Sequence, residues 1–128
     1  MHALGVSGTA ALPITERDAL LLIVPMFHVN AWGIPYSGWL AGADLIMPER
    51  FLQAEPLSRL IALARPTCSS GVPTIWSELL RFAETHDVDL SSMRIVTSGG
   101  SALPRSLLER FEERFGVAMV QGWGMRCV

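Results

Sequence analysis

A run of six consecutive apolar residues, 19–24, constrains the fold of this chain more than any other feature. A strand whose successive side chains are all apolar must be covered on both faces, as in a parallel sheet with helices packed on it. Strand-like and helix-like segments then alternate along the chain. After the first strand we predict helices at 28–41, 56–64, 73–83 and 104–115 and strands at 44–47, 67–70, 95–96 and 117–120. The predicted fold class is therefore α/β, with a mostly parallel sheet and helices on both faces.

Composition narrows the class of protein. A chain of 128 residues, half of them hydrophobic, has material for one core, so we expect one domain or a part of one. A net charge of -2 provides no basic stripe and argues against a nucleic acid partner. The longest apolar run is far shorter than the ~20 residues of a transmembrane segment. Cys68 and Cys127 fit no metal-ligand spacing, and reduced thiols in the cytoplasm are expected, with Cys68 as a small buried side chain.

Four unusual segments follow the predicted strands. They are residues 25–28, 69–74, 98–104 and 121–125. In parallel sheets, ligands bind beyond the carboxyl ends of the strands, so we expect these segments to share one ligand-binding rim.

Two of these segments are candidates for binding a flat ligand. The paired glycines within 98–104 let the backbone approach such a ligand, and a helix N-terminus follows; a tight turn without a ligand is the alternative. In segment 121–125 an indole flanked by glycines is suited to stacking on a base, with a core tryptophan as the alternative. The candidate nucleotide-binding residues are Ser98, Gly99, Gly100, Ser101, Ala102, Gln121, Gly122, Trp123 and Gly124.

Other nucleotide motifs are missing from the sequence. It contains no Gly-rich turn ending in Lys-Ser or Lys-Thr and no dinucleotide fingerprint, so no segment is assigned to phosphate and a Rossmann-type hydride-transfer protein is disfavoured. His28 stands where the first strand meets its helix. A hydrogen-bonding role at the helix end is the alternative to a catalytic one.

In this order, the segments resemble the middle of the adenylate-forming superfamily, which includes the fatty-acyl-CoA synthetases. Residues 25–28, Pro-Met-Phe-His, resemble the aromatic and histidine motif of the acid pocket, and residues 71–74, Gly-Val-Pro-Thr, resemble the segment beside the acyl tunnel. Residues 98–104 resemble the Gly-Gly-Ala loop that contacts adenine. Residues 121–125 resemble the opening of a Gly-aromatic-Gly-x-Thr-Glu motif.

The resemblance implies a two-step reaction. A carboxylate attacks the α-phosphate of ATP to give an acyl-adenylate and pyrophosphate, and the thiol of coenzyme A then displaces AMP. Trp123 would stack on adenine opposite the backbone of Gly99 to Ala102, and His28, the catalytic candidate, would hold the carboxylate against the phosphorus. Apolar side chains near the acid imply a fatty acid, long-chain in the parent enzyme, although core packing is the alternative role for most of them. The acyl-binding candidates are His28, Trp32, Gly71, Val72 and Thr74.

The sequence also departs from the family pattern. The phosphate loop with its Lys, the ribose-binding Asp and the C-terminal domain with its catalytic Lys are not found, and Arg126 and Cys127 replace the expected Thr and Glu. That Glu is the family's Mg²⁺ ligand, so we expect no metal site. Residues 1–128 are therefore expected to form a partial AMP-binding domain, truncated at both ends and inactive alone. The alternative is a non-catalytic α/β module without a ligand that self-associates through exposed sheet edges.

Overall fold

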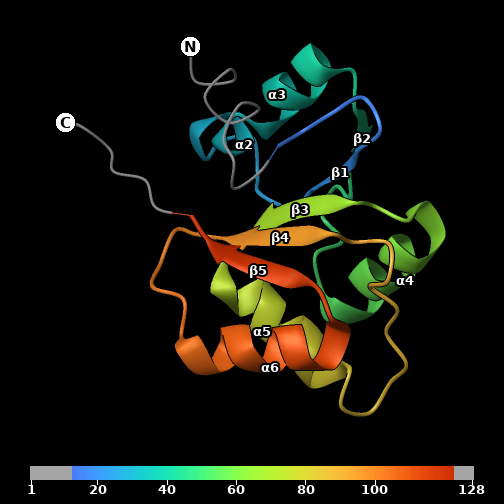
Figure 1. Cartoon of the computed structure of the whole chain (residues 1–128), viewed down its shortest axis with the longest axis vertical. Helices are drawn as coiled ribbons and strands as arrows, with labels where there is room; N and C mark the ends of the chain where they lie inside the picture. The colour runs from blue at the N-terminus through green and yellow to red at the C-terminus, as the bar shows by residue number, and fades with distance from the viewer. Residues whose placement is uncertain (1–12, 123–128) are drawn as a thin grey trace.

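A computed structural model describes residues 13–122 of the chain (Figure 1). The strands are β1 (Ala19–Leu22), β2 (Asp44–Ile46), β3 (Cys68–Gly71), β4 (Ile95–Ser98) and β5 (Ala118–Gln121). The helices are α2 (Val29–Trp32), α3 (Ile34–Ala41), α4 (Ala54–Ala64), α5 (Pro73–Phe82) and α6 (Arg105–Phe115). The strands form one sheet in the order β2-β1-β3-β4-β5, and all pairings are parallel. The predicted α/β class with a parallel sheet is confirmed.

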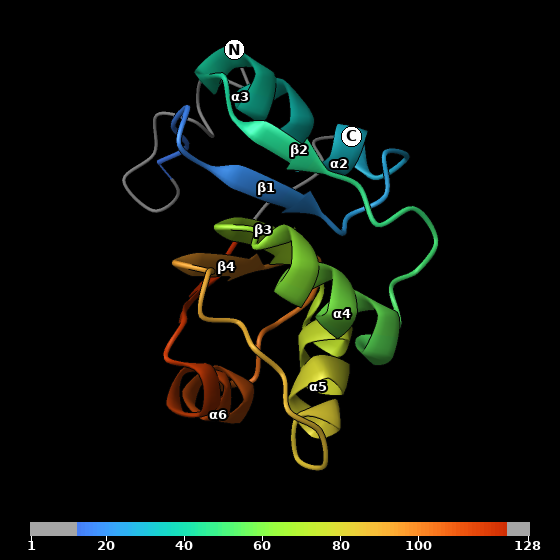
Figure 2. The ribbon, with the colours of Figure 1, turned by 90° about the vertical axis from the view of Figure 1, so that its right-hand side faces the viewer.

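The sheet separates two apolar cores, because successive side chains of a strand point to opposite faces. In β1, Leu21 joins the larger core and Leu20 joins the smaller one. Helices α4, α5 and α6 cover the face of the larger core, and α2 and α3 lie on the other side (Figures 1 and 2). Helices therefore occupy both faces, as predicted.

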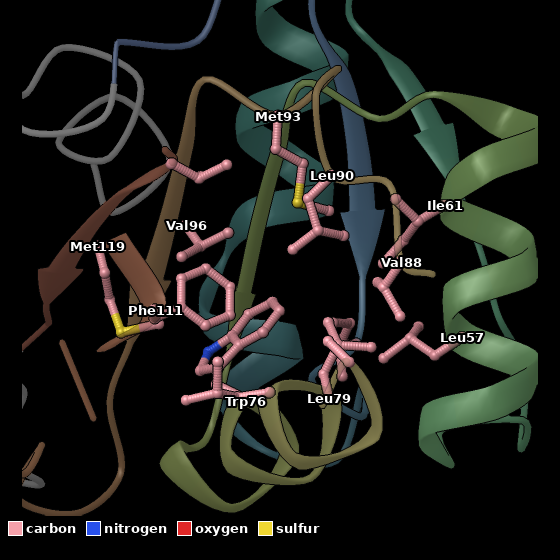
Figure 3. Close-up of a cluster of buried hydrophobic side chains, with 14 of the residues drawn as sticks. Leu57, Ile61, Trp76, Leu79, Val88, Leu90, Met93, Val96, Phe111 and Met119 are labelled. Carbon is pink, nitrogen blue, oxygen red and sulfur yellow. The ribbon is translucent and has the colours of Figure 1, made fainter. Parts of the chain in front are cut away.

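Aromatic packing forms the centre of the larger core (Figure 3). The fully buried rings of Trp76 and Phe111 meet edge to face, with centroids 5.8 Å apart and an interplanar angle of 72°. Edge-to-face pairs place the positive ring edge against the negative ring face, which adds about 1 kcal/mol to the burial of the rings. This contact joins α5 to α6 beneath the sheet.

The predicted single helix at 28–41 is wrong, because the structure divides it into α2 and α3 at Gly33. Ala31, Trp32 and Gly33 have φ values of 51°, 58° and 75°, which belong to the left-handed region and cannot continue a right-handed helix. The new start at Ile34 is followed by Pro35, whose missing N–H is tolerated in a first turn.

Other element ends shift by a few residues. Strand β4 continues to Ser98 and β5 to Gln121, so these two candidate residues lie in strands rather than in loops. Pro104 precedes α6 with an extended backbone instead of opening its first turn. The predicted glycine ends of α3 and α6 are confirmed, since Gly42 and Gly116 adopt φ values of 77° and 66°.

A buried carboxylate fastens the amino ends of three strands. Asp18 precedes β1 and accepts hydrogen bonds from Thr67 Oγ1 at 2.7 Å, before β3, and from Arg94 Nε at 3.0 Å, before β4. The backbone N–H of Thr15 donates to the other oxygen at 2.8 Å. Burial by itself raises the pKa of Asp18, but hydrogen bonds from Arg94, Thr67 and Thr15 outweigh it and hold that pKa well below its usual range. These hydrogen bonds thus hold β1, β3 and β4 together at the end of the sheet opposite its carboxyl rim.

Candidate functional site at the carboxyl rim of the sheet

The carboxyl ends of β3, β4 and β5 lie level with one another. Gly71 pairs with Ser98, and Ser98 pairs with Gln121. Beyond the strands the alignment continues through the backbone: Gly99 N–H donates to Gly71 O at 3.1 Å, and Gly122 N–H donates to Ser98 O at 2.7 Å. The structure confirms that the segments after these three strands leave from one rim.

The glycine pair after β4 has little room for side chains. A Cβ on Gly99 would stand 3.2 Å from the carbonyl oxygen of Gly122 and 3.2 Å from Cη2 of Trp32. Gly100 has a φ of 80°, a conformation that favours glycine, and its Cβ would stand 3.4 Å from Cγ1 of Val72. Close neighbours at Gly99 and the positive φ at Gly100 therefore both favour glycine.

The same contacts bring two sets of candidate residues together. Trp32 and Val72 are acyl-binding candidates, whereas Gly99 and Gly100 are nucleotide-binding candidates, and the four form one contact cluster at the rim. We call these four residues the rim cluster. Trp32 is half-buried and reaches the glycines from α2. An apolar ring therefore lies directly against the loop assigned to the nucleotide.

Two of the remaining candidates, His28 and Thr74, are exposed, whereas the acyl-binding candidate Gly71 is buried at the end of β3. His28 is exposed in the turn before α2, where its backbone N–H donates to Pro25 O at 3.0 Å. Its ring lies 4.6 Å from the ring of Phe27, itself 81% exposed, at an angle of 50°. Thr74 is exposed in the first turn of α5. The helix-end hydrogen bond named as the alternative for His28 thus involves its main chain.

Only some of the other nucleotide-binding candidates lie among the described residues. Ser101 and Ala102 are exposed in the loop that leads to α6, and Gln121 is exposed at the end of β5. Trp123 and Gly124 lie outside the described residues, so the predicted stacking of Trp123 opposite the glycine pair stays a prediction.

Trp76 lies beneath the rim, although the sequence predicted only that it belongs to a helix. The Trp76 indole from α5 is so close to Gly71 that a Cβ there would stand 3.1 Å from its ring, and its Nε1–H donates to Thr97 O at 3.3 Å. Next to Thr97, Ser98 is fully buried, and its Oγ has no hydrogen-bond partner among residues 13–122. Apolar spacing identified the buried position of Trp76, but no local pattern indicated its contact with the rim.

Two surface hollows flank α5 rather than the rim. One is lined by residues that include Ala54 and Phe82, and the other by residues that include Leu80, Pro104 and Arg110. Neither is lined by the glycines of the rim cluster, so the cluster's close contacts, not these hollows, define the candidate site.

The described part of the chain contains neither a cluster of metal ligands nor a membrane-spanning helix. Within it, no three His, Cys, Asp or Glu side chains are grouped so as to hold a metal ion. No helix of residues 13–122 has both the length and the apolar character that crossing a bilayer requires.

Comparison with known proteins gives consistent matches. The chain matches the protein family described as AMP-binding enzyme over residues 2–126. Over 125 residues it is 41% identical to a long-chain-fatty-acid–CoA ligase of Thermus thermophilus and 39% identical to a 3-methylmercaptopropionyl-CoA ligase of Ruegeria pomeroyi. Each alignment covers 98% of this chain but 23% of the relative, so the chain spans just under a quarter of the length of these curated relatives.

A solved structure supports the same relationship. The inhibitor-bound N-terminal domain of FACL13 from Mycobacterium tuberculosis superposes on this chain with a TM-score of 0.82 at 26% identity. The superposition covers 97% of this chain and 31% of that domain.

Proposed function

This chain belongs to the family of AMP-binding enzymes, and on that premise we propose that it is part of an acyl-CoA synthetase. The parent reaction joins a carboxylic acid to the α-phosphate of ATP, releases pyrophosphate, and then transfers the acyl group to the thiol of coenzyme A. The observation that supports this proposal most is the rim cluster, in which bare backbone at Gly99 and Gly100 adjoins the apolar side chains of Trp32 and Val72.

The proposed roles follow from chemistry at the rim. Backbone from Ser98 to Ala102 and from Gln121 to Gly124 would receive the adenine, and Trp123 would stack on its face, because an aromatic ring binds a flat base without needing charge. His28 would hold the carboxylate near the α-phosphate as a positioning group. ATP and AMP are thus the proposed nucleotides, and coenzyme A is the proposed acyl acceptor of the parent enzyme.

The acid is proposed to be a fatty acid. Trp32 and Val72 offer an apolar surface beside the glycine pair. Gly71 lies buried at the end of β3, and Thr74 lies in the adjoining helix turn. The two curated relatives carry the names of different acids, one long-chain and one short with a thioether, so the long-chain assignment belongs to the proposal.

The chain by itself is proposed to be inactive. It spans 23% of the curated relatives, and its ten basic residues are all arginines, so it lacks a lysine for phosphate or for the adenylate. Catalysis of phosphoryl transfer depends on charged groups placed around the phosphorus. The proposal also assigns no Mg²⁺ ligand to this chain, since Arg126 and Cys127 stand where Thr and Glu were expected. A cytoplasmic location is part of the proposal, supported by the free, buried thiol of Cys68.

Calorimetric titration with AMP tests the binding half of the proposal. We expect binding at millimolar concentration or tighter, lost in Trp123→Ala and kept in Trp39→Ala. Trp39 is the matched control because it is 73% exposed on α3 and makes an edge contact with Tyr36. If the unaltered chain gives no heat at high AMP concentration, the proposal that it binds the nucleotide is rejected. A pyrophosphate-release assay with ATP, Mg²⁺ and fatty acid should give no signal.

Self-association without a ligand is the second candidate. Strands β2 and β5 are the edges of the described sheet, and Trp39, Leu40 and Tyr36 expose apolar surface on α3. Exposed edges and apolar patches favour association. Size-exclusion chromatography at micromolar concentration should then show an oligomer that dissociates in Trp39→Ser, whereas a monomer rejects this candidate.

A further inference from the structure

We propose that Trp76 is the positioning residue of the rim: its indole, pressed between helix and sheet, sets where the backbone of Gly99 and Gly100 lies. The role in ligand binding rests on the proposed function. The positioning itself is a property of the fold and is tested separately.

One side chain connects four elements at this place. Trp76 belongs to α5 and is fully buried; its ring lies under Gly71 of β3, and its Nε1–H donates to Thr97 O of β4 at 3.3 Å. On its other side it meets Phe111 of α6, with ring centroids 5.8 Å apart (Figure 3). Displacement of this ring would therefore move the ends of two neighbouring strands.

These contacts adjoin the hydrogen bonds that align the rim. Gly71, which the indole touches, supplies the carbonyl for Gly99 N–H, and Ser98, which follows the indole's acceptor Thr97, supplies the carbonyl for Gly122 N–H. Because each of these bonds is within one residue of a Trp76 contact, loosening the indole should open them more often than bonds elsewhere in the sheet.

The end of β4 has few other side-chain hydrogen bonds to the helices beneath it. The Ser98 side chain points to no partner among the described residues, although its Oγ is buried. Thr97 Oγ1 bonds sideways to Ser70 of β3, within the sheet. Among residues 13–122, the Trp76 indole is thus the side chain whose hydrogen bond joins the last residues of β4 to the helices beneath.

Amide hydrogen exchange followed by NMR tests the proposal on the full 128-residue chain. Trp76→Phe keeps a buried ring but removes the Nε1–H. We expect exchange at Gly99 and Gly122 to accelerate up to about tenfold more than at Leu21, the order of effect that one hydrogen bond produces. Leu57→Ala is the control, since Leu57 is fully buried in the same core but on α4; it should not accelerate Gly99 and Gly122 more than Leu21.

A second variant leaves the indole in place. Gly71→Ala adds a methyl 3.1 Å from the Trp76 ring, and it should produce the same selective acceleration at Gly99 even if Trp76→Phe fails to fold. Equal acceleration at Gly99, Gly122 and Leu21 in the folded variants would overturn the positioning role.

AMP titration separates this inference from the proposed function. If both are right, Trp76→Phe weakens AMP binding by about the factor seen in exchange, while Leu57→Ala leaves it unchanged. If the unaltered chain binds no AMP, the proposed nucleotide binding is rejected. The exchange result still decides whether Trp76 positions the rim.

Discussion

The indole of Trp32 lies against Gly99, so close that a Cβ on the glycine would stand 3.2 Å from Cη2 of the ring. This contact joins the last residue of α2 to the loop after β4. An acyl-binding candidate and a nucleotide-binding candidate therefore constrain each other directly, and several measurable consequences arise from this and related contacts.

Gly99→Ala is expected to destabilise the chain by about 1–3 kcal/mol, because the new methyl overpacks against Trp32 and against the Gly122 carbonyl at 3.2 Å. In a Trp32→Ala background, Gly99→Ala should destabilise the chain less, by at least about 0.5 kcal/mol, because the Trp32 ring no longer contacts the added methyl. Urea unfolding of the two single variants and the double variant measures this coupling. Strictly additive effects would show that the ring and the glycine do not interact.

Gly116→Ala tests the cap of α6 without a packing effect. Gly116 has a φ of 66°, and an added Cβ would meet no atom within 4 Å. The expected loss of about 1 kcal/mol therefore comes from the left-handed backbone alone. Gly116→Asn should lose less, because asparagine tolerates this conformation. The prediction fails if thermal unfolding ranks the two variants in the opposite order.

Asp18 is expected to make the chain sensitive to acid. Its folded-state pKa is lowered, so the unfolded state binds the proton first, and falling pH favours unfolding. The stabilisation is complete above the unfolded pKa of about 3.9 and is lost progressively below it.

Asp18→Asn should accordingly cost about 1–3 kcal/mol at pH 7, because the buried carboxylate loses its charge-assisted hydrogen bonds with Arg94 and Thr67. Its stability should also change less than that of the parent chain between pH 5 and pH 2. Asp44→Asn, at an exposed position, is the matched control. An unchanged acid response in Asp18→Asn, measured by urea unfolding across this pH range, would contradict the assignment.

The Cys68 thiol is expected to be unreactive in the folded chain. Burial raises its pKa to about 11, and its Sγ lies 3.5 Å from the Asp18 carboxylate. Since the thiolate is the reactive form, only about one thiol in a thousand would be ionised at pH 8. A Cys127→Ser variant isolates Cys68, and labelling with a disulfide reagent at pH 8 should be at least about a hundredfold slower in the folded state than in guanidinium. Similar rates in both states would refute this.

The sheet was the most predictable part of the chain. Residues 19–24 and the later apolar runs predicted parallel strands between helices, because a strand buried on both faces cannot tolerate polar alternation. The same pattern could not predict the break at Ala31 to Gly33. Two non-glycine residues there adopt left-handed backbone, and such strain persists when surrounding contacts, such as Trp32 on Gly99, compensate it.

Part of the candidate site was also accessible from the sequence. Glycines at the ends of predicted parallel strands indicated one shared rim. There Gly99 N–H donates to Gly71 O, and Gly122 N–H donates to Ser98 O. The Trp76 indole beneath the rim and the Asp18 cluster at the opposite end were not foreseen. The residues that they contact are distant in sequence, and local hydrophobic periodicity does not predict which strands become neighbours.

The sequence by itself determined that apolar strands and amphipathic helices alternate and that glycines follow the strands, since both depend on local side-chain spacing and backbone freedom. Only the tertiary structure decided that Trp32 and Trp76 contact the rim from different helices. Contacts of that kind depend on strand order, which is set by the packing of the whole sheet.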